Sequence, residues 1–298
     1  MEVRVRVPAK VNLTLNVGAT DNEGYHALGT LFQAVSLFDD LVARPAEAGV
    51  FRVNFRGEGA SGLPVGDTNL VVRAARLLAE TCEMGNLGVE IRVHKRIPVA
   101  GGMAGGSADA AATLVACNQL WGTGLDTGQL HAVAARLGAD VPFLLYGGTA
   151  VGTGRGEKLR SVPVSGSFQW VLALSHHGLS TPAVFREFDR ISAPQPTDID
   201  SGLLEALADG DARRVGALLR NDLQRAAFNL QPELADVLAM GREAGATGAL
   251  VSGSGPTIAF LADTKAIADA ISDRLVLSSR VRAVRRAHGP VPGAQIVN

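Results

Sequence analysis

Cysteine is scarce in this chain of 298 residues, and neither sign of charge is in excess. Its two cysteines, Cys82 and Cys117, and its six histidines show no metal-ligand spacing, which disfavours a disulfide scaffold or a zinc module. Lysine and arginine number 28 against 29 aspartates and glutamates and do not cluster, which disfavours nonspecific nucleic-acid binding. We therefore expect no resident metal and no nucleic-acid partner.

Long apolar runs are also missing. No uninterrupted apolar stretch reaches the length of a transmembrane helix. The first residues alternate valine with arginine, unlike the apolar core of a signal peptide. Together with the scarcity of cysteine, these absences predict a cytoplasmic protein with no membrane partner.

Hydrophobic residues make up 47% of the chain, enough for one large or two modest packed domains. Strand-like patterns such as 89–99 are mixed with helix-like patterns such as 211–228, which predicts the α+β class. The segment 161–168 is rich in serine, glycine and proline. We expect it to separate two domains, 1–160 and 161–298.

The most informative stretch runs from Lys95 to Leu114, KRIPVAGGMAGGSADAAATL. A strand-like run breaks into small residues and continues as an alanine-rich helix, for which Ser107 is the expected N-cap. Such a corner exposes backbone N–H groups at the positive end of a helix, and glycine lets the backbone approach a ligand closely. The stretch therefore predicts a phosphate-binding loop.

Two common nucleotide-binding motifs do not account for this loop. No Gly-Lys-Ser or Gly-Lys-Thr follows a glycine run, so the P-loop is absent. The Gly-x-Gly-x-x-Gly pattern at Gly57–Gly62 is followed by Pro64 and Gly66 rather than by a helix, so the dinucleotide-binding context fails. A corner needed only for tight packing stays open as an alternative. Asp109, in the first helical turn, would repel a phosphate, although it would also suit a magnesium ion or the helix start.

Three polar residues outside the loop, Lys10, Asn12 and Asp140, can be interpreted either as ordinary structural residues or as parts of an active site. Lys10 and Asn12 share one face of the strand pattern that resumes after Pro8, and an isolated strand lysine is usually solvated. Asp140 suits a catalytic carboxylate and an N-cap equally, because Pro142 would fall in the first turn of a following helix.

Nine short motifs, taken in order, resemble those of the GHMP small-molecule kinases and extend from residue 8 to 256. They are Pro8-Ala-Lys-Val-Asn-Leu13, Gly24-Tyr-His26, Leu31-Phe-Gln33, Asp67-Thr-Asn69, the loop Pro98–Ala111, Gly138-Ala-Asp-Val-Pro-Phe143, Gly147-Gly-Thr-Ala150, Gly154-Arg-Gly-Glu157 and Ser252-Gly-Ser-Gly-Pro256. The loop alone supports only the superfamily. The Pro-Ala-Lys-x-Asn and Gly-Tyr-His motifs resemble members that phosphorylate the 2-hydroxyl of a cytidine diphosphate alcohol.

This resemblance implies a fold and a set of roles. ATP would bind an N-terminal α/β domain, 1–160, and the alcohol would bind in a cleft against a C-terminal α+β domain, 161–298. Asp140 would be the base and Lys10 its charged partner near the acceptor hydroxyl. The implied substrate-binding residues are Asn12, Tyr25, His26, Phe32, Thr181 and Phe185.

Within the substrate group, Tyr25 and Phe185 would stack on the cytosine ring and His26 would read its edge, with Phe32 lining the same pocket. Thr181 would lie near the substrate phosphates. The residues that the resemblance assigns to ATP are Asn69, Lys95, Pro98, Val99, Ala100, Gly101, Gly102, Met103, Ala104, Gly105, Gly106, Ser107 and Ala108. The Ser252–Pro256 turn could close on the substrate or be a plain β-turn.

The loop departs from the usual family pattern at three positions. Met103, Ala104 and Ala108 stand where relatives usually carry leucine, glycine and serine. Ala104 disfavours a positive φ, and Ala108 lacks a hydroxyl that could contact phosphate or metal.

The expected partners are therefore ATP, with Mg²⁺ carried by the nucleotide, and a cytidine diphosphate alcohol. We expect a monomer or a weak homodimer. Two alternatives stay open: a GHMP kinase for another alcohol, such as homoserine or mevalonate, and a ligand-binding or nucleic-acid-binding protein that has kept the fold and lost catalysis. The near-neutral charge and the presence of both Lys10 and Asp140 count against the second alternative.

Overall fold

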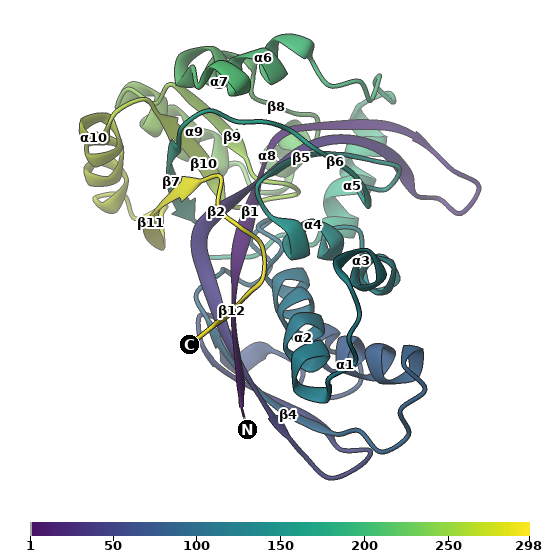
Figure 1. Cartoon of the computed structure of the whole chain (residues 1–298). Coiled ribbons are helices and arrows are strands. Elements are labelled where there is room, and N and C mark those ends of the chain that lie inside the picture. The colour runs from purple at the N-terminus through teal and green to yellow at the C-terminus, as the bar shows by residue number, and fades with distance from the viewer. Residues whose placement is uncertain (1) are drawn as a thin grey trace.

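The computed structural model describes residues 2–298 and mixes helices with two antiparallel-rich sheets (Figure 1). The strands are β1 (Val3–Thr20), β2 (His26–Pro45), β3 (Phe51–Gly57), β4 (Val89–Lys95), β5 (Thr149–Thr153), β6 (Lys158–Ser161), β7 (Phe168–Leu174), β8 (Arg220–Asn221), β9 (Gly248–Val251), β10 (Ile258–Ala262), β11 (Ala283–Gly289) and β12 (Gln295–Val297). The helices are α1 (Leu70–Thr81), α2 (Gly105–Trp121), α3 (Thr127–Ala135), α4 (Val141–Tyr146), α5 (Thr181–Ile191), α6 (Ser201–Asp209), α7 (Ala212–Leu218), α8 (Gln224–Leu230), α9 (Glu233–Glu243) and α10 (Lys265–Val276), with a 3₁₀ turn at Ala60–Gly62. The predicted α+β class is confirmed.

A long antiparallel hairpin, β1 with β2, organises the larger sheet, whose order is β12-β1-β2-β4-β3 with β5, β6 and β8 attached. Figure 1 shows this ribbon running through the molecule with α1 to α4 on one side. The alternating valines at the start of the chain and the alternation after Pro8 join into one strand, with a register shift between Pro8 and Ala9. Because β12 pairs with the start of β1, the two ends of the chain lie close together.

The smaller sheet has the order β11-β7-β10-β9. The chain changes sheet between β6 and β7, inside the segment 161–168 that the sequence offers as a boundary. The two sheets nevertheless share one hydrophobic core: Trp170 of β7 is buried in the cluster that contains the valines of β1, and its indole Nε1 donates to Gln33 Oε1 of β2 at 2.9 Å. The division at residue 160 stays a prediction.

Two predictions about helices are wrong. Residues 211–228 do not form one helix: α7 ends at Leu218, and β8 then pairs with Thr14 and Leu15 of β1 before α8 begins. The pairing with β1 is a long-range contact that helical periodicity does not reveal. The helix after the glycine loop begins at Gly105, not after an N-cap at Ser107. Separately, none of the helices in residues 2–298 combines the length and apolar character needed to cross a membrane.

Candidate active site

The glycine-rich loop links β4 to α2 through several left-handed residues. Gly102 has a φ of +74°, and a Cβ at this position would lie 2.0 Å from the Ser252 carbonyl oxygen. Only glycine fits there without moving the backbone. Ala104, the residue before the first turn of α2, has a φ of 60°. The sequence indicates that alanine disfavours this conformation, and the structure adopts it all the same, as it does at Ala100 with a φ of 50°.

The Ser252–Pro256 turn and the residue after it are hydrogen-bonded to the glycine-rich loop. The Ser252 hydroxyl donates to the Gly102 carbonyl at 3.1 Å, and the Thr257 N–H donates to the Gly101 carbonyl at 3.3 Å. The hydroxyls of Ser254 and Thr181 are hydrogen-bonded at 2.8 Å, which links the same turn to the start of α5. The turn therefore joins the loop to the element that carries Thr181 and Phe185.

Lys95, at the end of β4, lies beneath the loop and is almost fully buried. Its ammonium group donates to Asp39 Oδ2 at 2.5 Å, to Asp109 Oδ2 at 2.6 Å and to the Gly105 carbonyl at 3.2 Å. Asp39 also accepts from the backbone N–H groups of Arg96 and Ile97. One lysine thus ties β2, the entry to the loop and the first turn of α2 together.

Burial disfavours the charged form of Lys95, but the adjacent charges of Asp109 and Asp39 outweigh that effect and raise the pKa of its ammonium group. Burial, together with the charge of Asp39, raises the pKa of Asp109 well above its ordinary value despite the opposing effect of Lys95. Both shifts reduce the free negative charge at the start of α2. The repulsion between Asp109 and a phosphate, which the sequence suggests, is therefore weakened by the burial of Asp109 and by the adjacent charge of Lys95.

Lys10 is the second buried lysine of the site. Its Nζ donates to Asn12 Oδ1 at 2.6 Å and lies 5.5 Å from the centroid of the Phe32 ring. The prediction that Lys10 and Asn12 share one face is confirmed, but this face is buried rather than solvated. The backbone N–H of Lys10 donates to the Met103 carbonyl at 3.3 Å, so β1 is attached directly to the glycine loop.

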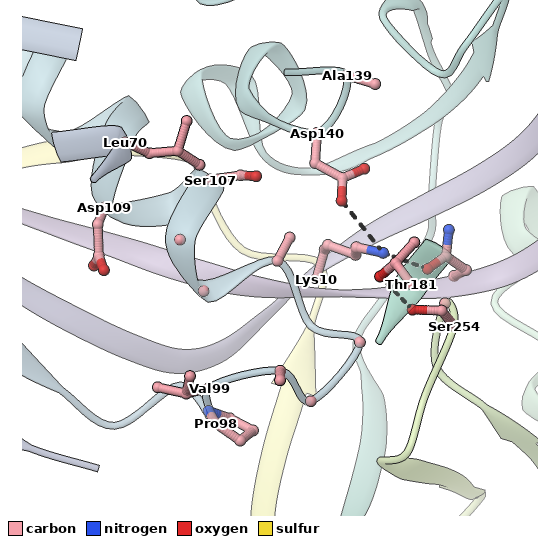
Figure 2. A pocket seen from close by; sticks show the side chains of 18 of the residues that line it. Lys10, Leu70, Pro98, Val99, Ser107, Asp109, Ala139, Asp140, Thr181 and Ser254 are labelled. Carbon is pink, nitrogen blue, oxygen red and sulfur yellow. Dashed lines mark hydrogen bonds and ion pairs between the residues drawn. The ribbon is translucent and has the colours of Figure 1, made fainter. Parts of the chain in front are cut away.

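Asp140 approaches Lys10 from the start of α4. Its Oδ2 lies 3.7 Å from Lys10 Nζ, and Figure 2 shows the carboxylate directed at the ammonium group. Asp140 occupies the N-cap position, with Pro142 in the first turn as the sequence suggests, yet its side chain accepts no capping hydrogen bond. Its carboxylate is therefore available for a ligand. Desolvation lowers the pKa of Lys10, and the charge of Asp140 opposes that shift only in part.

These residues line a cavity of about 570 Å³, which we call the loop cavity. Its walls hold Lys10, Asn12, Asp140 and most of the glycine loop, and Figure 2 shows that loop passing below the Lys10–Asp140 pair. The predicted ATP-binding residues that line it are Asn69, Lys95, Pro98, Val99, Ala100, Gly101, Gly102, Ala104, Gly105, Gly106 and Ser107. Met103 and Ala108 are fully buried and are not part of its lining, so their side chains pack in the core.

A second cavity, of about 830 Å³, lies beside the turn between β1 and β2, and we call it the hairpin cavity. Tyr25, His26 and Phe185 line it. The two cavities share five lining residues: Leu28, Ala139, Arg155, Thr181 and Phe185. A ligand of sufficient length can therefore extend from the tip of the hairpin to the glycine loop.

One predicted residue, Phe32, lies outside its expected surroundings, and the side chain of another, Asn69, is engaged within the fold. Phe32 lines the loop cavity beside Lys10 and stacks on Phe143 at 4.9 Å, rather than joining Tyr25 and His26. Asn69 lines the loop cavity, but its side chain is engaged as the N-cap of α1: Oδ1 accepts from the Val71 N–H, and Nδ2 donates to the Pro64 carbonyl.

Arg155 is a residue of the site to which sequence reasoning gives no role. Its guanidinium lies 3.9 Å from the centroid of the Tyr25 ring and pairs with Asp21 and Glu23 of the hairpin turn. These hydrogen bonds raise the pKa of Arg155, so it is a permanent cation at the junction of the two cavities. The Gly154-Arg-Gly-Glu157 motif was the signal that could have drawn attention to it.

Comparison with known proteins bears on this arrangement. The GHMP kinases N terminal domain matches residues 69–148, and the GHMP kinases C terminal domain matches residues 203–278. The chain is 54% identical over 303 residues to the 4-diphosphocytidyl-2-C-methyl-D-erythritol kinase of Thermobifida fusca, covering 99% of this chain and 98% of the relative. The chain belongs to the GHMP kinase family, in its 4-diphosphocytidyl-2-C-methyl-D-erythritol kinase group. Membership of this kinase family implies that ATP is used.

Further relatives agree with this assignment. The kinase of the same name from Streptomyces coelicolor is 51% identical, with both chains covered in full. A crystal structure of a 4-(cytidine 5'-diphospho)-2C-methyl-D-erythritol kinase superposes with a TM-score of 0.76 at 36% identity, over 97% of this chain and 98% of the other. A homoserine kinase from Cytophaga hutchinsonii reaches 0.79 at 22% identity, over 99% and 97%. The fold is thus common to kinases of different alcohols and does not select the substrate.

Proposed function

We propose that this kinase transfers the γ-phosphoryl group of ATP to the 2-hydroxyl of 4-diphosphocytidyl-2-C-methyl-D-erythritol. The products are ADP and the 2-phosphate, in the non-mevalonate route to isoprenoid precursors. One observation carries the proposal: the Lys10–Asp140 pair faces a cavity lined by the glycine loop, and that cavity continues into an aromatic cavity at the hairpin. Because the reaction consumes ATP, a cytoplasmic location is part of the proposal.

In the loop cavity, the glycine loop and the first turn of α2 would hold the triphosphate. Backbone N–H groups at the start of a helix bind phosphate oxygens, and α2 is long enough to have a substantial dipole. Lys95 supports this function from below by fixing the Gly105 carbonyl and offsetting the charge of Asp109. The loop would therefore be positioned before the nucleotide binds.

Asp140 would accept the proton of the acceptor hydroxyl as the new P–O bond forms and the bond to the ADP oxygen breaks. A phosphoryl transfer of this kind depends mainly on positioning and on charge stabilisation. Lys10 supplies a positive charge beside the reacting oxygen, and Asn12 fixes the direction of its ammonium group. Burial of Lys10 strengthens its electrostatic effect, because little water screens it.

Magnesium would arrive on the nucleotide. In residues 2–298 no three histidine, cysteine, aspartate or glutamate side chains are grouped so as to hold a metal ion. This donor set fits an ion held mainly by phosphates and water, with one or two protein oxygens. The Ser107 hydroxyl and the Asp140 carboxylate, which both line the loop cavity, are the groups that would face it. The ion would neutralise charge on the phosphates.

In the hairpin cavity, Tyr25 and Phe185 would stack on the cytosine ring. Arg155 covers one face of the Tyr25 ring, and the side chain is otherwise exposed in a turn, so a base would stack on the other face. Arg155 would lie near the diphosphate, because it stands at the junction through which the linker between base and alcohol must pass. Such a cation suits phosphate oxygens.

A coupled assay of ADP release tests the proposal against a kinase for another alcohol. We expect rapid ADP release with 4-diphosphocytidyl-2-C-methyl-D-erythritol and only background release with homoserine or mevalonate. Equal rates with 2-C-methyl-D-erythritol 4-phosphate, which lacks the cytidine group, would refute the proposed substrate.

A further inference from the structure

A chain of three hydrogen bonds leads from Lys10 into the interior of the larger sheet. Lys10 Nζ donates to Asn12 Oδ1 at 2.6 Å, and Asn12 Nδ2 donates to Thr30 Oγ1 at 2.8 Å. The Thr30 hydroxyl donates in turn to the Thr14 carbonyl at 2.9 Å. All four residues are buried, and Thr30 is completely so. A partner lost from this chain is therefore not readily replaced by water.

The direction of each hydrogen bond follows from the inner end of the chain. The Thr14 carbonyl only accepts, so the single proton of the Thr30 hydroxyl must point toward it. Thr30 Oγ1 can then only accept from Asn12, which must turn its NH₂ toward Thr30 and its amide oxygen toward Lys10. Thr30 thus decides which end of the Asn12 amide Lys10 meets.

The local structure makes room for Thr30 at this point. The pairing of β1 with β2 shifts by one residue between Asn12 and Thr14, and such irregularities redirect side chains. On the neighbouring strand β5, a Cβ at Gly152 would lie 3.1 Å from the Thr30 methyl carbon. Glycine at position 152 therefore leaves space for a branched side chain that also carries a hydroxyl.

The Ser252–Pro256 turn packs closely against the outer end of the chain. A Cβ at Gly253, whose φ is +56°, would lie 3.2 Å from Lys10 Nζ and 3.3 Å from Asn12 Oδ1. The Lys10–Asn12 pair is therefore confined by this turn while Thr30 holds it from β2. An ammonium group confined in this way has little freedom to find another acceptor.

We propose that Thr30 is a positioning residue for the phosphoryl transfer, a proposal that rests on the function proposed above. By fixing the Asn12 amide, Thr30 keeps the Lys10 ammonium group beside Asp140 and the acceptor hydroxyl. Without the Thr30 hydroxyl, the Asn12 NH₂ loses its acceptor, and a rotated amide would set its NH₂ against the Lys10 ammonium. Either change displaces the positive charge, and phosphoryl transfer depends on charges in fixed positions.

The test contrasts Thr30→Val with Thr30→Ser. Valine keeps the shape of threonine and loses the hydroxyl, whereas serine keeps the hydroxyl and loses the methyl group. We expect kcat with 4-diphosphocytidyl-2-C-methyl-D-erythritol to fall by about 10- to 100-fold in Thr30→Val, the range for a buried polar group left unpaired, and to stay close to the wild-type value in Thr30→Ser. The KM for ATP should be unchanged in both. A role in packing alone gives the reverse order, with serine the more damaging replacement.

Thr149→Val is the matched control. Thr149 of β5 is also buried in the larger sheet, and its hydroxyl accepts from Gln33 Nε2 at 3.2 Å, but it lines neither cavity. Its loss should leave kcat unchanged. A cooperative thermal transition verifies that each variant is folded. Thr30→Cys, whose thiol is a weaker hydrogen-bonding group, replaces Thr30→Val if that variant does not fold, and its kcat should lie below that of Thr30→Ser.

A double-mutant cycle shows whether Thr30 acts through Asn12. Because Asn12→Ala already removes the amide, Thr30→Val should cause little further loss of kcat in that background. Additive losses would show that Thr30, which also lines the loop cavity, acts without Asn12, and they would overturn the proposal. So would a Thr30→Ser enzyme less active than Thr30→Val. If the wild-type enzyme does not phosphorylate the cytidine substrate, the proposed function fails instead, so the two failures are distinguished.

Discussion

The ammonium nitrogen of Lys10 lies 3.7 Å from Oδ2 of Asp140, and these two groups come from segments far apart in the chain. Lys10 is fixed on β1 by its hydrogen bond to Asn12, whereas Asp140 stands at the start of α4 without capping it. The separation is that of an ion pair rather than of a tight hydrogen bond. A substrate hydroxyl beside Asp140 would therefore also lie near the positive charge.

The pKa of the Lys10 ammonium should lie below its ordinary value of 10.5, because burial disfavours the charged form. Replacing Asp140 with asparagine should lower this pKa further, since the carboxylate opposes the effect of burial. Lysine side-chain carbon NMR can measure both values in a chain with only four lysines, Lys10, Lys95, Lys158 and Lys265.

Lys95 provides an internal control in the same spectra. Its pKa is raised by Asp109 and Asp39, so it should titrate above 10.5 and should not respond to Asp140→Asn. If Lys10 titrates above 10.5, or if its pKa rises when Asp140 is removed, the electrostatic description of the pair is wrong.

Replacing Ala104 with glycine should stabilise the protein by about 0.5–1 kcal/mol. The left-handed conformation costs alanine about 1–2 kcal/mol, part of which is offset by the greater entropy that glycine loses on folding. Urea denaturation of the two proteins measures the difference. Ala108→Gly is the control, because Ala108 lies inside α2 and its replacement should destabilise by about 1 kcal/mol. A loss of stability in both variants would contradict the argument.

Replacing Asp109 with asparagine should change how stability depends on pH. In the unfolded chain, Asp109 loses its proton near its ordinary pKa of 3.8. In the folded protein its pKa is raised, so Asp109 keeps this proton at pH values where the unfolded chain has lost it. Wild-type stability should therefore fall, relative to Asp109→Asn, as the pH rises from about 4. The limiting slope for one group is about 1.4 kcal/mol per pH unit.

Denaturing the wild type and Asp109→Asn at a series of pH values between 4 and 8 measures this difference. Most other titrating groups contribute equally to both proteins and therefore cancel in the comparison. A difference that is independent of pH would show that Asp109 has no raised pKa.

Replacing Tyr25 with alanine should raise the KM for the cytidine substrate by about 10- to 100-fold, the effect of losing one aromatic face stacked on a base. The KM for ATP should not change, because Tyr25 lines the hairpin cavity and not the loop cavity. Tyr146, the other tyrosine of the chain, lines neither cavity and serves as the control: Tyr146→Ala should leave both constants unchanged. A rise in both KM values for Tyr25→Ala would argue against separate binding regions.

Local patterns in the sequence predict much of this structure. The alternation on either side of Pro8 correctly places Lys10 and Asn12 on one face, and the run of small residues correctly predicts the corner between β4 and α2. The N-cap at Ser107 is wrong, because the loop enters the helix through the left-handed Ala104, which no residue preference indicates.

Long-range contacts are what the sequence does not reveal. The break between α7 and α8 depends on the pairing of β8 with β1, and the electrostatic surroundings of Asp109 depend on its burial and on Lys95 and Asp39, which come from other strands. The surroundings of the His26 ring likewise come from Gly18 across the hairpin and from Asp189 of α5. Periodicity and motif spacing carry no information about these partners. The roles assigned to the site residues stay predictions.

The most direct test of the account is ADP release by the wild-type protein and by Asp140→Asn, with 4-diphosphocytidyl-2-C-methyl-D-erythritol and ATP·Mg. We expect substrate-dependent release by the wild type and a rate about 100- to 10,000-fold lower in the variant, the usual contribution of a positioned base, with ATP binding retained. No substrate-dependent release by the wild type, or a variant rate within a few-fold of it, would contradict the account.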